Sequence, residues 1–593
     1  MRALHGSGTI ASSERGAALV MTLLVLVVLT AFGMTLVALG TSEVAMSSNW
    51  RDYSKDFYAA EAALESGVVG LRNLLPATPT PTQAQLNTIA TPPTLSDARL
   101  TFGAYTITAA SPAPNRQTFV TGPYSGLFGW VQGYTIQAQV NGQGGTKAKL
   151  TQVLQHTRVP LFQFGIFYGK GVDLELRPGP NMSFNGKIFS NSNIYIAAGS
   201  TLQITDSVKA AGNIYRSIKS EPTFPNMSNP QIADAAGTLQ TLNFDHAYQP
   251  GFGSTWSAGA WASQAMQTFG GRVQDSAMGV QQIVPPLPDL FGNPANPDAV
   301  AHQLIEMPQA GDSAALASAK MYSQADVRII DGVATGLTCT PAVGASAITT
   351  KPFYDAREGK TMTAYDIDVN VLRINNCLPK QGAGQLGTVL YVAGTNMATN
   401  PVVRLVNGSQ LPSQGLTVVS QNPVYIAGNY NCPSGDCTVL PNGTNHPPAA
   451  VLGDAVTVLS KAWMPKNFDA KGDQPFFGNR VAEETTVNAA IATGPSSEST
   501  MGRDNGKVNN LVRFLEDWVG STGTPTKFNY SGSLLALWHS EQVTGAWRCC
   551  GITGLYYYSP PNRVWGYDTL FDTTQPPGTP MGVIMTKGSW SQS

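Results

Sequence analysis

One uncharged stretch near the N-terminus constrains the fold of this chain more than any other feature. No Asp, Glu, Lys or Arg occurs between Arg15 and Glu43. This run exceeds the roughly 20 apolar residues with which a helix crosses the hydrocarbon core of a bilayer, whereas the apolar core of a secretory signal has only about 7–15. Arg2 and Arg15 precede the run, which favours a cytoplasmic N-terminus. The stretch therefore predicts a single transmembrane helix over residues 17–42.

The helical pattern continues beyond the uncharged stretch. Apolar residues recur at helical spacing after Arg51, while Glu61 and Glu65 mark the opposite face, and no proline occurs before Pro76. The segment that we expect to dock on the rest of the protein comprises Phe57, Ala60, Glu61, Leu64, Val68 and Leu71. One continuous helix over residues 17–75 is predicted, roughly 80–90 Å long. A plain membrane anchor has no need of such an extension.

Several of these features together resemble one protein family. A short leader ends in Arg15-Gly16, a long apolar helix follows, and Phe-Tyr-Ala-Ala-Glu-Ala-Ala-Leu-Glu occupies residues 57–65. This N-terminal region is similar to that of type IV pilus assembly proteins of the PilX type, which are minor pilins. The resemblance implies that residues 1–16 are a prepilin leader, which prepilin peptidase removes after Gly16 so that Ala17 becomes the N-terminus.

The resemblance also implies where the protein resides and what it contacts. The helix would wait in the inner membrane as a single pass with a cytoplasmic N-terminus, and would then pack against other minor and major pilins in a surface pilus. One position departs from the family: most pilins have a Glu at the fifth mature position, where this chain has Met21. A subunit without that Glu could sit where no preceding neighbour exists, at the tip, although minor pilins of this type often lack it.

The residues after the helix predict a mostly β protein of the α+β class. Residues 76–97 are rich in Pro and Thr, which indicates an extended linker. Over residues 98–165 apolar and polar residues alternate, as in Tyr134-Thr-Ile-Gln-Ala-Gln-Val, which predicts antiparallel strands like those of a pilin.

A short internal repeat suggests the architecture of the head. Ile188–Tyr195 aligns with Val208–Tyr215 at an offset of 20 residues, so Asn193 and Asn213 would stack at a corner. Such a period is typical of stacked coils, and it predicts a β-solenoid over residues 166–220 and 331–470. The alternative is an ordinary β-sandwich.

Two regions lack this pattern. Residues 221–330 contain Gly-rich and Pro-rich stretches, and we interpret them as an insertion across the solenoid. Residues 471–593 are expected to form a C-terminal α+β region that begins with an amphipathic helix over residues 508–519.

Composition and motifs exclude several functions. Only 12% of the residues are charged and the net charge is −1, so no basic surface for nucleic acid is expected. The six His residues are scattered without a metal-binding or catalytic motif, and no cofactor site is recognised, so we expect no enzyme. A structural calcium site at residues 431–436 is conceivable but has no further support.

The cysteines fit an exported protein. All six lie in the second half of the chain, and six allow fifteen pairings. Candidates for disulfides are Cys432 and Cys437, which could close a small loop, together with Cys339 and Cys377.

Two other functions stay open from the sequence alone. The chain could be a capping pseudopilin of a type II secretion system, a class that also lacks the fifth-position Glu and carries a large head. It could also be an uncleaved, membrane-anchored surface adhesin or polysaccharide-binding protein, in which aromatic residues such as Trp538 and Trp565 would stack on sugars or, as we favour, pack in the core. The surface or carbohydrate ligand of such a head is unknown.

Overall fold

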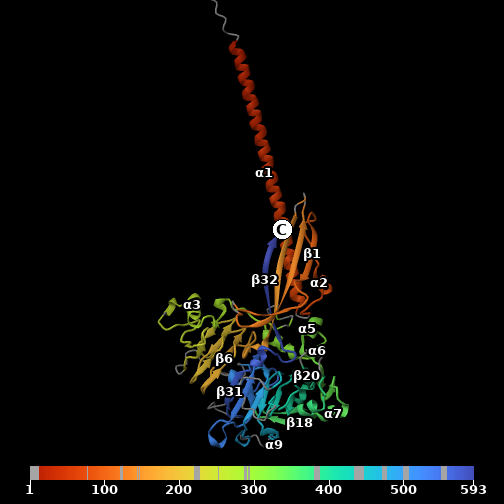
Figure 1. Ribbon diagram of the computed structural model, residues 1–593, viewed down its shortest axis with the longest axis vertical. Coiled ribbons are helices and arrows are strands. Elements are labelled where there is room, and N and C mark those ends of the chain that lie inside the picture. The colour runs from red at the N-terminus through yellow and green to blue at the C-terminus, as the bar shows by residue number, and fades with distance from the viewer. Residues whose placement is uncertain are drawn as a thin grey trace, which may run out of the picture.

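The protein consists of a long helix, a small antiparallel sheet and a large β-rich head, as the computed structural model shows (Figure 1). The structure describes residues 13–593 except 76–77, 121–123, 143–144, 146, 220–226, 252, 286, 288–289, 291–293, 380–386, 433–445, 471–476, 498–506 and 549–556. Helix α1 spans Ser13–Leu74, so the predicted continuous helix is present as one element. The fold is α+β and mostly β, as the sequence predicted.

The second half of α1 packs on an antiparallel sheet. Its strands are β1 (Thr101–Ala109), β2 (Asn115–Thr118), β3 (Phe128–Asn141), β4 (Lys147–Pro160) and β32 (Met581–Gln592). The order is β1-β3-β4-β32, with β2 on the end of β3. Because β32 is the C-terminal strand, the whole head is inserted between the last two strands of this sheet. The C-terminus accordingly lies beside α1 in Figure 1.

The predicted linker is partly helical. Helix α2 (Gln83–Ile89) begins at Thr82, whose hydroxyl accepts a hydrogen bond from the backbone N–H of Gln85 in a capping box. Leu86 is fully buried against the core between α1 and the sheet. The expectation of an extended linker over residues 76–97 was wrong in this part, because one well-placed leucine and a capped turn outweigh the flanking Pro and Thr.

The first half of the head is built from short parallel strands on three faces. The first face contains β5 (Ile166–Tyr168), β8 (Ile188–Ser190), β11 (Val208–Ala210) and β15 (Val273–Gln274). The second face contains β6 (Leu174–Leu176), β9 (Ile194–Ile196) and β12 (Ile214–Tyr215). The third face contains β7 (Met182–Phe184), β10 (Leu202–Ile204) and β13 (Gln231–Ala233), with β14 (Leu239–Thr241) antiparallel at its edge. Ile188 pairs with Val208 and Ile194 with Ile214, so the offset of the sequence repeat is the register of the ladders. A β-sandwich of antiparallel sheets does not account for these ladders.

The second half of the head extends the same pattern with longer coils. Its first face contains β16 (Val327–Ile330), β20 (Thr388–Ala393), β22 (Leu416–Val419), β24 (Ala449–Leu452), β27 (Ala490–Ala492) and β30 (Leu534–Ala536). Its second face contains β19 (Lys360–Asp368), β21 (Pro401–Val406), β23 (Val424–Ala427), β25 (Val456–Leu459) and β28 (Arg513–Phe514). Its third face contains β26 (Thr485–Asn488), β29 (Lys527–Gly532) and β31 (Asn562–Tyr567). Thr388 pairs with Leu416 and Ala450 with Ala490, so the spacing between paired strands is wider here and varies from coil to coil.

The two halves form one stack, although the order of the coils in the stack differs from their order in the sequence. Leu534 of β30, the last coil of the second half, pairs in parallel with Ile166 of β5, the first coil of the first half. The chain therefore enters the stack in the middle, winds to the β15 end, crosses to the β16 end and winds back to the middle. The resulting sheet runs β15-β11-β8-β5-β30-β27-β24-β22-β20-β16-β17, with β17 (Val333–Thr335) antiparallel at the end.

The return crossing covers the outer face of this sheet. We call residues 275–326 the crossing segment; it contains α4 (Pro297–His302), α5 (Ala314–Ala319) and α6 (Met321–Gln324). Its apolar side chains, among them Leu304 and Ile305, pack with outward-facing residues of the strands such as Tyr391 and Leu452. The predicted insertion over residues 221–330 begins later than expected, because β13 and β15 still pair with the coils before them.

The C-terminal region over residues 471–593 is not a separate α+β unit. Its strands β26–β31 continue the parallel ladders, and β32 belongs to the antiparallel sheet. The helix predicted over residues 508–519 was wrong: Arg513 and Phe514 form β28 and pair with Thr457 and Val458. The helical spacing of its apolar residues arises because Leu511, Phe514 and Trp518 all face the core of the stack.

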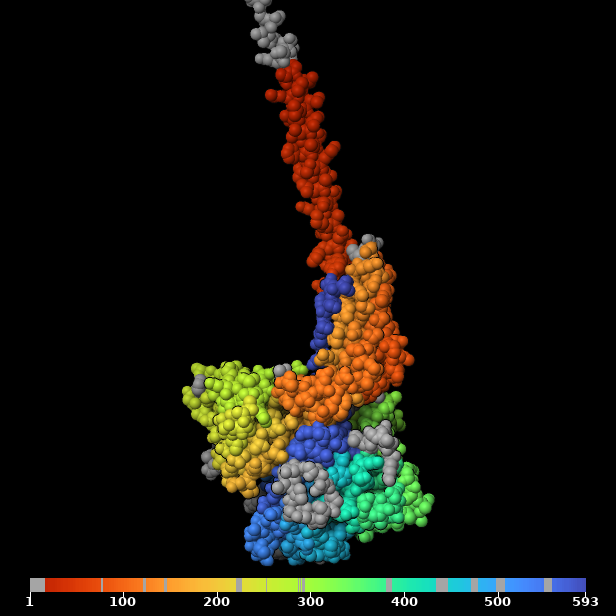
Figure 2. All heavy atoms as spheres, viewed as in Figure 1, coloured from red at the N-terminus to blue at the C-terminus, as the bar shows by residue number. Residues whose placement is uncertain are grey.

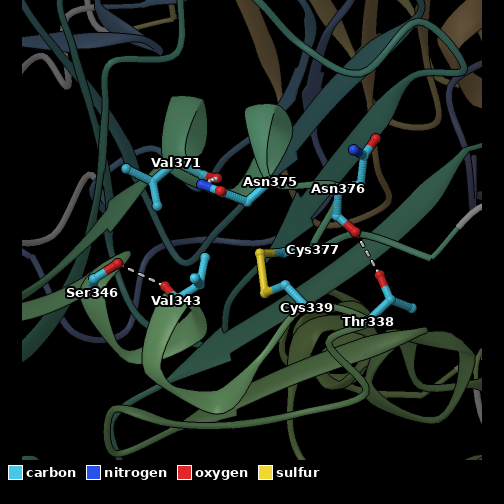
Figure 3. Close-up of a disulfide and its surroundings, with 8 residues drawn as sticks. All are labelled: Thr338, Cys339, Val343, Ser346, Val371, Asn375, Asn376 and Cys377. Carbon is cyan, nitrogen blue, oxygen red and sulfur yellow. Dashed lines mark hydrogen bonds between the residues drawn. A yellow bond between two sulfur atoms is a disulfide. The ribbon is translucent and has the colours of Figure 1, made fainter.

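A disulfide fastens the β16 end of the stack (Figure 3). Cys339 and Cys377, two of the predicted disulfide cysteines, are bonded to each other. They join the start of α7 (Pro341–Ser346) to the residues after α8 (Val369–Ile374), and the Thr338 hydroxyl donates a hydrogen bond to the carbonyl of Asn376 beside them. Cys432 is disulfide-bonded as well. Cys437 lies outside the described residues, as do Cys549, Cys550 and most of the suggested calcium loop.

Candidate functional site: the N-terminal helix

The first half of α1 projects from the molecule as a bare apolar rod (Figures 1 and 2). From residue 16 to residue 51 every side chain is exposed. Among the described residues, α1 is the one helix that is long and apolar enough to cross a membrane, judged by length and composition. An exposed apolar surface of this size is unstable in water, so it requires a bilayer or other helices around it.

The threonine hydroxyls in this half are hydrogen-bonded within the helix. The hydroxyls of Thr22, Thr30, Thr35 and Thr41 each donate a hydrogen bond to a backbone carbonyl three or four residues earlier. Such pairing matters in hydrocarbon, where an unsatisfied polar group costs several kcal/mol. The threonines are therefore compatible with burial in lipid or between helices.

The predicted processing residues lie at the membrane end of this rod. Gly16 and Ala17 are exposed on the helix, and a β-carbon added at Gly16 would meet nothing within 4 Å. Met21, at the position of the missing Glu, is 72% exposed. The structure leaves all three residues accessible to other molecules, and residues 1–12 of the leader lie outside the described part of the chain.

The second half of α1 docks on the antiparallel sheet along the predicted face. Ala60, Leu64, Val68 and Leu71 are buried against Tyr134, Ile136 and Leu150 of the sheet, and Phe57 is partly buried at the same surface. Glu61, which we included in the docking segment, is exposed on the opposite face and makes no contribution to this core. At about 1.5–3 kcal/mol for each large side chain removed from water, this contact holds the helix to the sheet.

Three further contacts at this junction were not visible in the sequence. The Tyr105 hydroxyl donates a hydrogen bond of 3.0 Å to the carbonyl of Ala63. Helix and sheet approach so closely at Gly67 that an added β-carbon would lie 2.8 Å from the Ile136 side chain. Lys587 of β32 forms an ion pair with Glu65. Since these two residues lie at opposite ends of the chain, no local pattern could reveal that pairing.

Asp56 marks the start of the docked half. Its side chain is fully buried, and neither carboxylate oxygen has a hydrogen-bond partner among the described residues. The adjacent ring of Phe57 contacts Trp590 of β32 edge to face, with 6.0 Å between ring centroids. A buried carboxylate without a partner is costly, so this junction is stabilised by the surrounding apolar contacts and not by Asp56.

One cluster in the head has the residue types of a metal site but not the chemistry. Ligand atoms of His302, Glu306 and Glu541 lie within 4.8 Å of one another. The His302 ring nitrogens, however, already contact Glu306 at 2.8 Å and Asp454 at 3.1 Å. Burial lowers the pKa of His302, but hydrogen bonds to Asp454 and Glu306 outweigh it and raise this pKa to about 9. As a protonated imidazole, His302 joins the crossing segment to the second half of the head as an ion pair, and a metal ion would first have to displace its proton.

Four of the described aromatic residues considered as sugar platforms are core residues, while Trp547 is only partly buried. Trp538, Trp565, Tyr557 and Tyr558 are all at most 5% exposed. This agrees with the packing role that we favoured for them.

Taken with the fold, the helix defines the class of protein. A long helix with a bare apolar half and a half docked on an antiparallel sheet is the arrangement that the resemblance to pilins implied. Residues 15–65 match the family described as PilX N-terminal, which confirms the resemblance to type IV pilus assembly proteins of the PilX type in that region. The chain matches no curated protein. The solved structure of the competence-associated pilin ComZ from Thermus thermophilus aligns with 91% of this chain and 98% of its own at 10% identity, but its TM-score of 0.27 is too low to support an inference.

Proposed function

We propose that this protein is a minor pilin of a type IV pilus that is inserted in the inner membrane, freed of its leader after Gly16 and incorporated in few copies at the pilus tip. The observation that carries the proposal is the division of α1 into a bare apolar half and a docked half. Lipid covers the bare half before assembly, and the helices of neighbouring pilins cover it afterwards. Because the head is attached to the docked half of α1, packing of the bare half into the fibre leaves the head on the outside of the fibre.

The size of the head favours the tip over the shaft. The head is far wider than the rod that would pack in the fibre (Figure 2). Regularly spaced copies of such a head would crowd one another along a shaft, whereas one copy at the end has free space. Met21 supports the same position, because a first subunit has no preceding neighbour whose amino terminus a Glu at this site would attract.

Cleavage of the leader tests this proposal with a matched pair of variants. Both Gly16→Leu and Gly40→Leu place a side chain where nothing lies within 4 Å, so neither disturbs the fold. The N-terminus of protein recovered from sheared surface fibres is read by mass spectrometry. We expect it at Ala17 in the wild type and in Gly40→Leu, and we expect Gly16→Leu to keep its leader and to be absent from fibres.

Other results would identify the alternatives. Cleavage near Gly40, blocked by Gly40→Leu, would make the apolar run a secretory signal and refute the pilin proposal. An intact leader in wild-type surface protein would favour a membrane-anchored adhesin. Cleavage at Ala17 together with release of the protein in short periplasmic fibres, and not in surface pili, would favour a capping pseudopilin of a type II secretion system.

A further inference from the structure

A pocket lies at the neck of the molecule, where three parts of the chain meet. It has a volume of about 300 Å³, and its walls include Leu75 at the end of α1, Met321 of α6 and Val583 of β32. Figure 1 shows α5 and α6 directly beneath the lower end of the antiparallel sheet, so the pocket lies between the sheet and the crossing segment. A volume of this size is at the lower end of the range for small-molecule sites.

Strand β4 supplies the two basic side chains of this pocket. His156 is only 1% exposed, and neither of its ring nitrogens has a hydrogen-bond partner among the described residues. Burial lowers the pKa of His156 to about 4, and the nearby charge of Arg158 adds to this effect. Because both ring nitrogens are buried, the imidazole is packed into the pocket wall and is not open to a ligand. Arg158, which is only partly buried, is the basic side chain that a ligand in the pocket can reach.

Arg158 lies two residues further along the same face of β4. Burial lowers its pKa, and the one group that opposes this effect is the hydroxyl of Tyr134, which is no carboxylate. Among the described residues, no carboxylate contributes to the electrostatic environment of its guanidinium. A partly buried guanidinium offers five N–H donors, and leaving them without an acceptor is unfavourable.

We propose that this neck pocket binds a small organic carboxylate, with its carboxylate on Arg158 and its apolar body against the remaining walls. A carboxylate matches the fork of an arginine and takes two parallel hydrogen bonds from it.

Charge and lining select this class over phosphate. One guanidinium balances a single negative charge, whereas a phosphate near neutral pH carries more than one charge and would leave the excess in a poorly hydrated pocket. Most of the other lining residues are apolar, including Leu304, Met321 and Val583, which suits a short hydrocarbon body. At about 30 Å³ per water-sized group, the pocket holds roughly ten non-hydrogen atoms.

Binding of butyrate to the full chain tests this proposal. Butyrate and its neutral isostere butyramide are titrated in Tris chloride against detergent-solubilised protein, and binding is followed by ligand-observed NMR. We expect saturable binding of butyrate with a Kd of about 1 mM, and binding of butyramide at least tenfold weaker. The Arg158→Met variant should weaken butyrate at least tenfold. Lys149→Met, which removes the same charge from the opposite face of β4, should leave the affinity unchanged.

Each other outcome would overturn the proposal. Absence of saturable butyrate binding up to about 50 mM, equal affinity for butyrate and butyramide, or equal affinity in wild type and a folded Arg158→Met variant would exclude the carboxylate site. Tighter binding of inorganic phosphate than of butyrate would assign the pocket to a different anion. If Arg158→Met does not fold, the comparison of butyrate with butyramide on the wild type still decides the question. None of these results bears on leader cleavage, so the proposal stands or falls separately from the pilin function.

Discussion

The two halves of the head share one parallel ladder but differ in whether its outward-facing polar residues are exposed or buried. On the second face of the first half, Glu175, Tyr195 and Tyr215 lie in register across β6, β9 and β12, and both tyrosines are partly exposed. On the second face of the second half, a polar row crosses five strands in register and every member is buried. This row consists of Asp366, Arg404, Tyr425, Thr457 and Arg513.

Coil length explains this difference. The first coils of the first half are short and nearly equal in length, as the pairs Ile166 with Ile188 and Ile188 with Val208 show, so no extra segment covers their outer face. Only the last coil, from Val208 to Val273, is longer. The longer coils of the second half carry extra segments that fold back over the outer face, such as α9 (Trp463–Lys466). The row beneath them must then be paired: Arg404 contacts Asp366 through two nitrogens at 2.7 and 2.8 Å and Asp469 through a third at 2.6 Å. A covered face thus depends on its ion pairs, whereas an open face does not.

The largest effect that we predict comes from breaking the covered row. Arg404→Met leaves Asp366 and Asp469 buried without their partner, so we expect the free energy of unfolding to fall by about 3–5 kcal/mol. The matched change in the first half, Lys219→Met, removes the partner of Asp173 from a partly exposed pair 2.9 Å apart and should cost less than about 1 kcal/mol. Urea denaturation measures both. Equal losses in the two variants would contradict the distinction between covered and open faces.

The disulfide should stabilise one end of the stack selectively. It closes a sequence separation of 38 residues, and its replacement in a Cys339→Ala/Cys377→Ala variant should cost about 3–4 kcal/mol. Hydrogen exchange should show the loss in β16, β17, α7 and α8. The β15 end, which is closed by Trp261 and Phe269 of α3 (Ala258–Phe269), serves as the internal control. Increased exchange there to the same extent would show that the two ends are one cooperative unit.

The second half should also respond to pH through one buried acid. Burial raises the pKa of Glu516 to about 7, against the hydrogen bonds that its carboxylate accepts from Ser460. Because the folded protein holds this proton more tightly than the unfolded chain, the stabilisation is present below about pH 4.5 and is lost as pH rises through 7. The loss amounts to at most about 3 kcal/mol.

A Glu516→Gln variant tests this pH dependence. Its amide cannot ionise, so the fall in stability between pH 5 and pH 8 should become smaller by about the same amount. The comparison is made by chemical denaturation at both pH values. If unfolding free energy fell with pH equally in the variant and the wild type, the pH dependence would belong to other groups. One such group is His302, whose raised pKa of about 9 places its titration at higher pH.

The smallest predicted effect concerns the corner ladder of the first half. The backbone N–H of Asn213 donates a hydrogen bond of 2.9 Å to the side-chain oxygen of Asn193, and that of Asn193 donates one of 3.1 Å to Asp173. Asn193→Ala removes the acceptor for Asn213, and we expect a loss of about 1 kcal/mol in unfolding free energy. A neutral result would mean that water replaces the ladder at this open corner.

The sequence predicted the parts of the fold that repeat locally. The period of apolar residues predicted α1 and its docking face at Leu64 and Val68, and the internal repeat predicted the register of Ile194 with Ile214. It could not predict the covered outer row, because the partners of Arg404 come from segments 38 and 65 residues away with no common period. It also assigned a helix to Arg513 and Phe514, where helical spacing and burial in the stack give the same pattern.

The candidate site divides in the same way. The amino-acid sequence alone determined that the chain carries a membrane-compatible helix with a docking face, because helix formation and apolar periodicity are properties of neighbouring residues. Only the tertiary structure decided that β32 closes the sheet beside β4, that β30 stacks on β5, and that His156 and Arg158 line a pocket at the neck. These contacts join residues hundreds of positions apart, and their stability comes from complementary surfaces that exist only once the chain has folded.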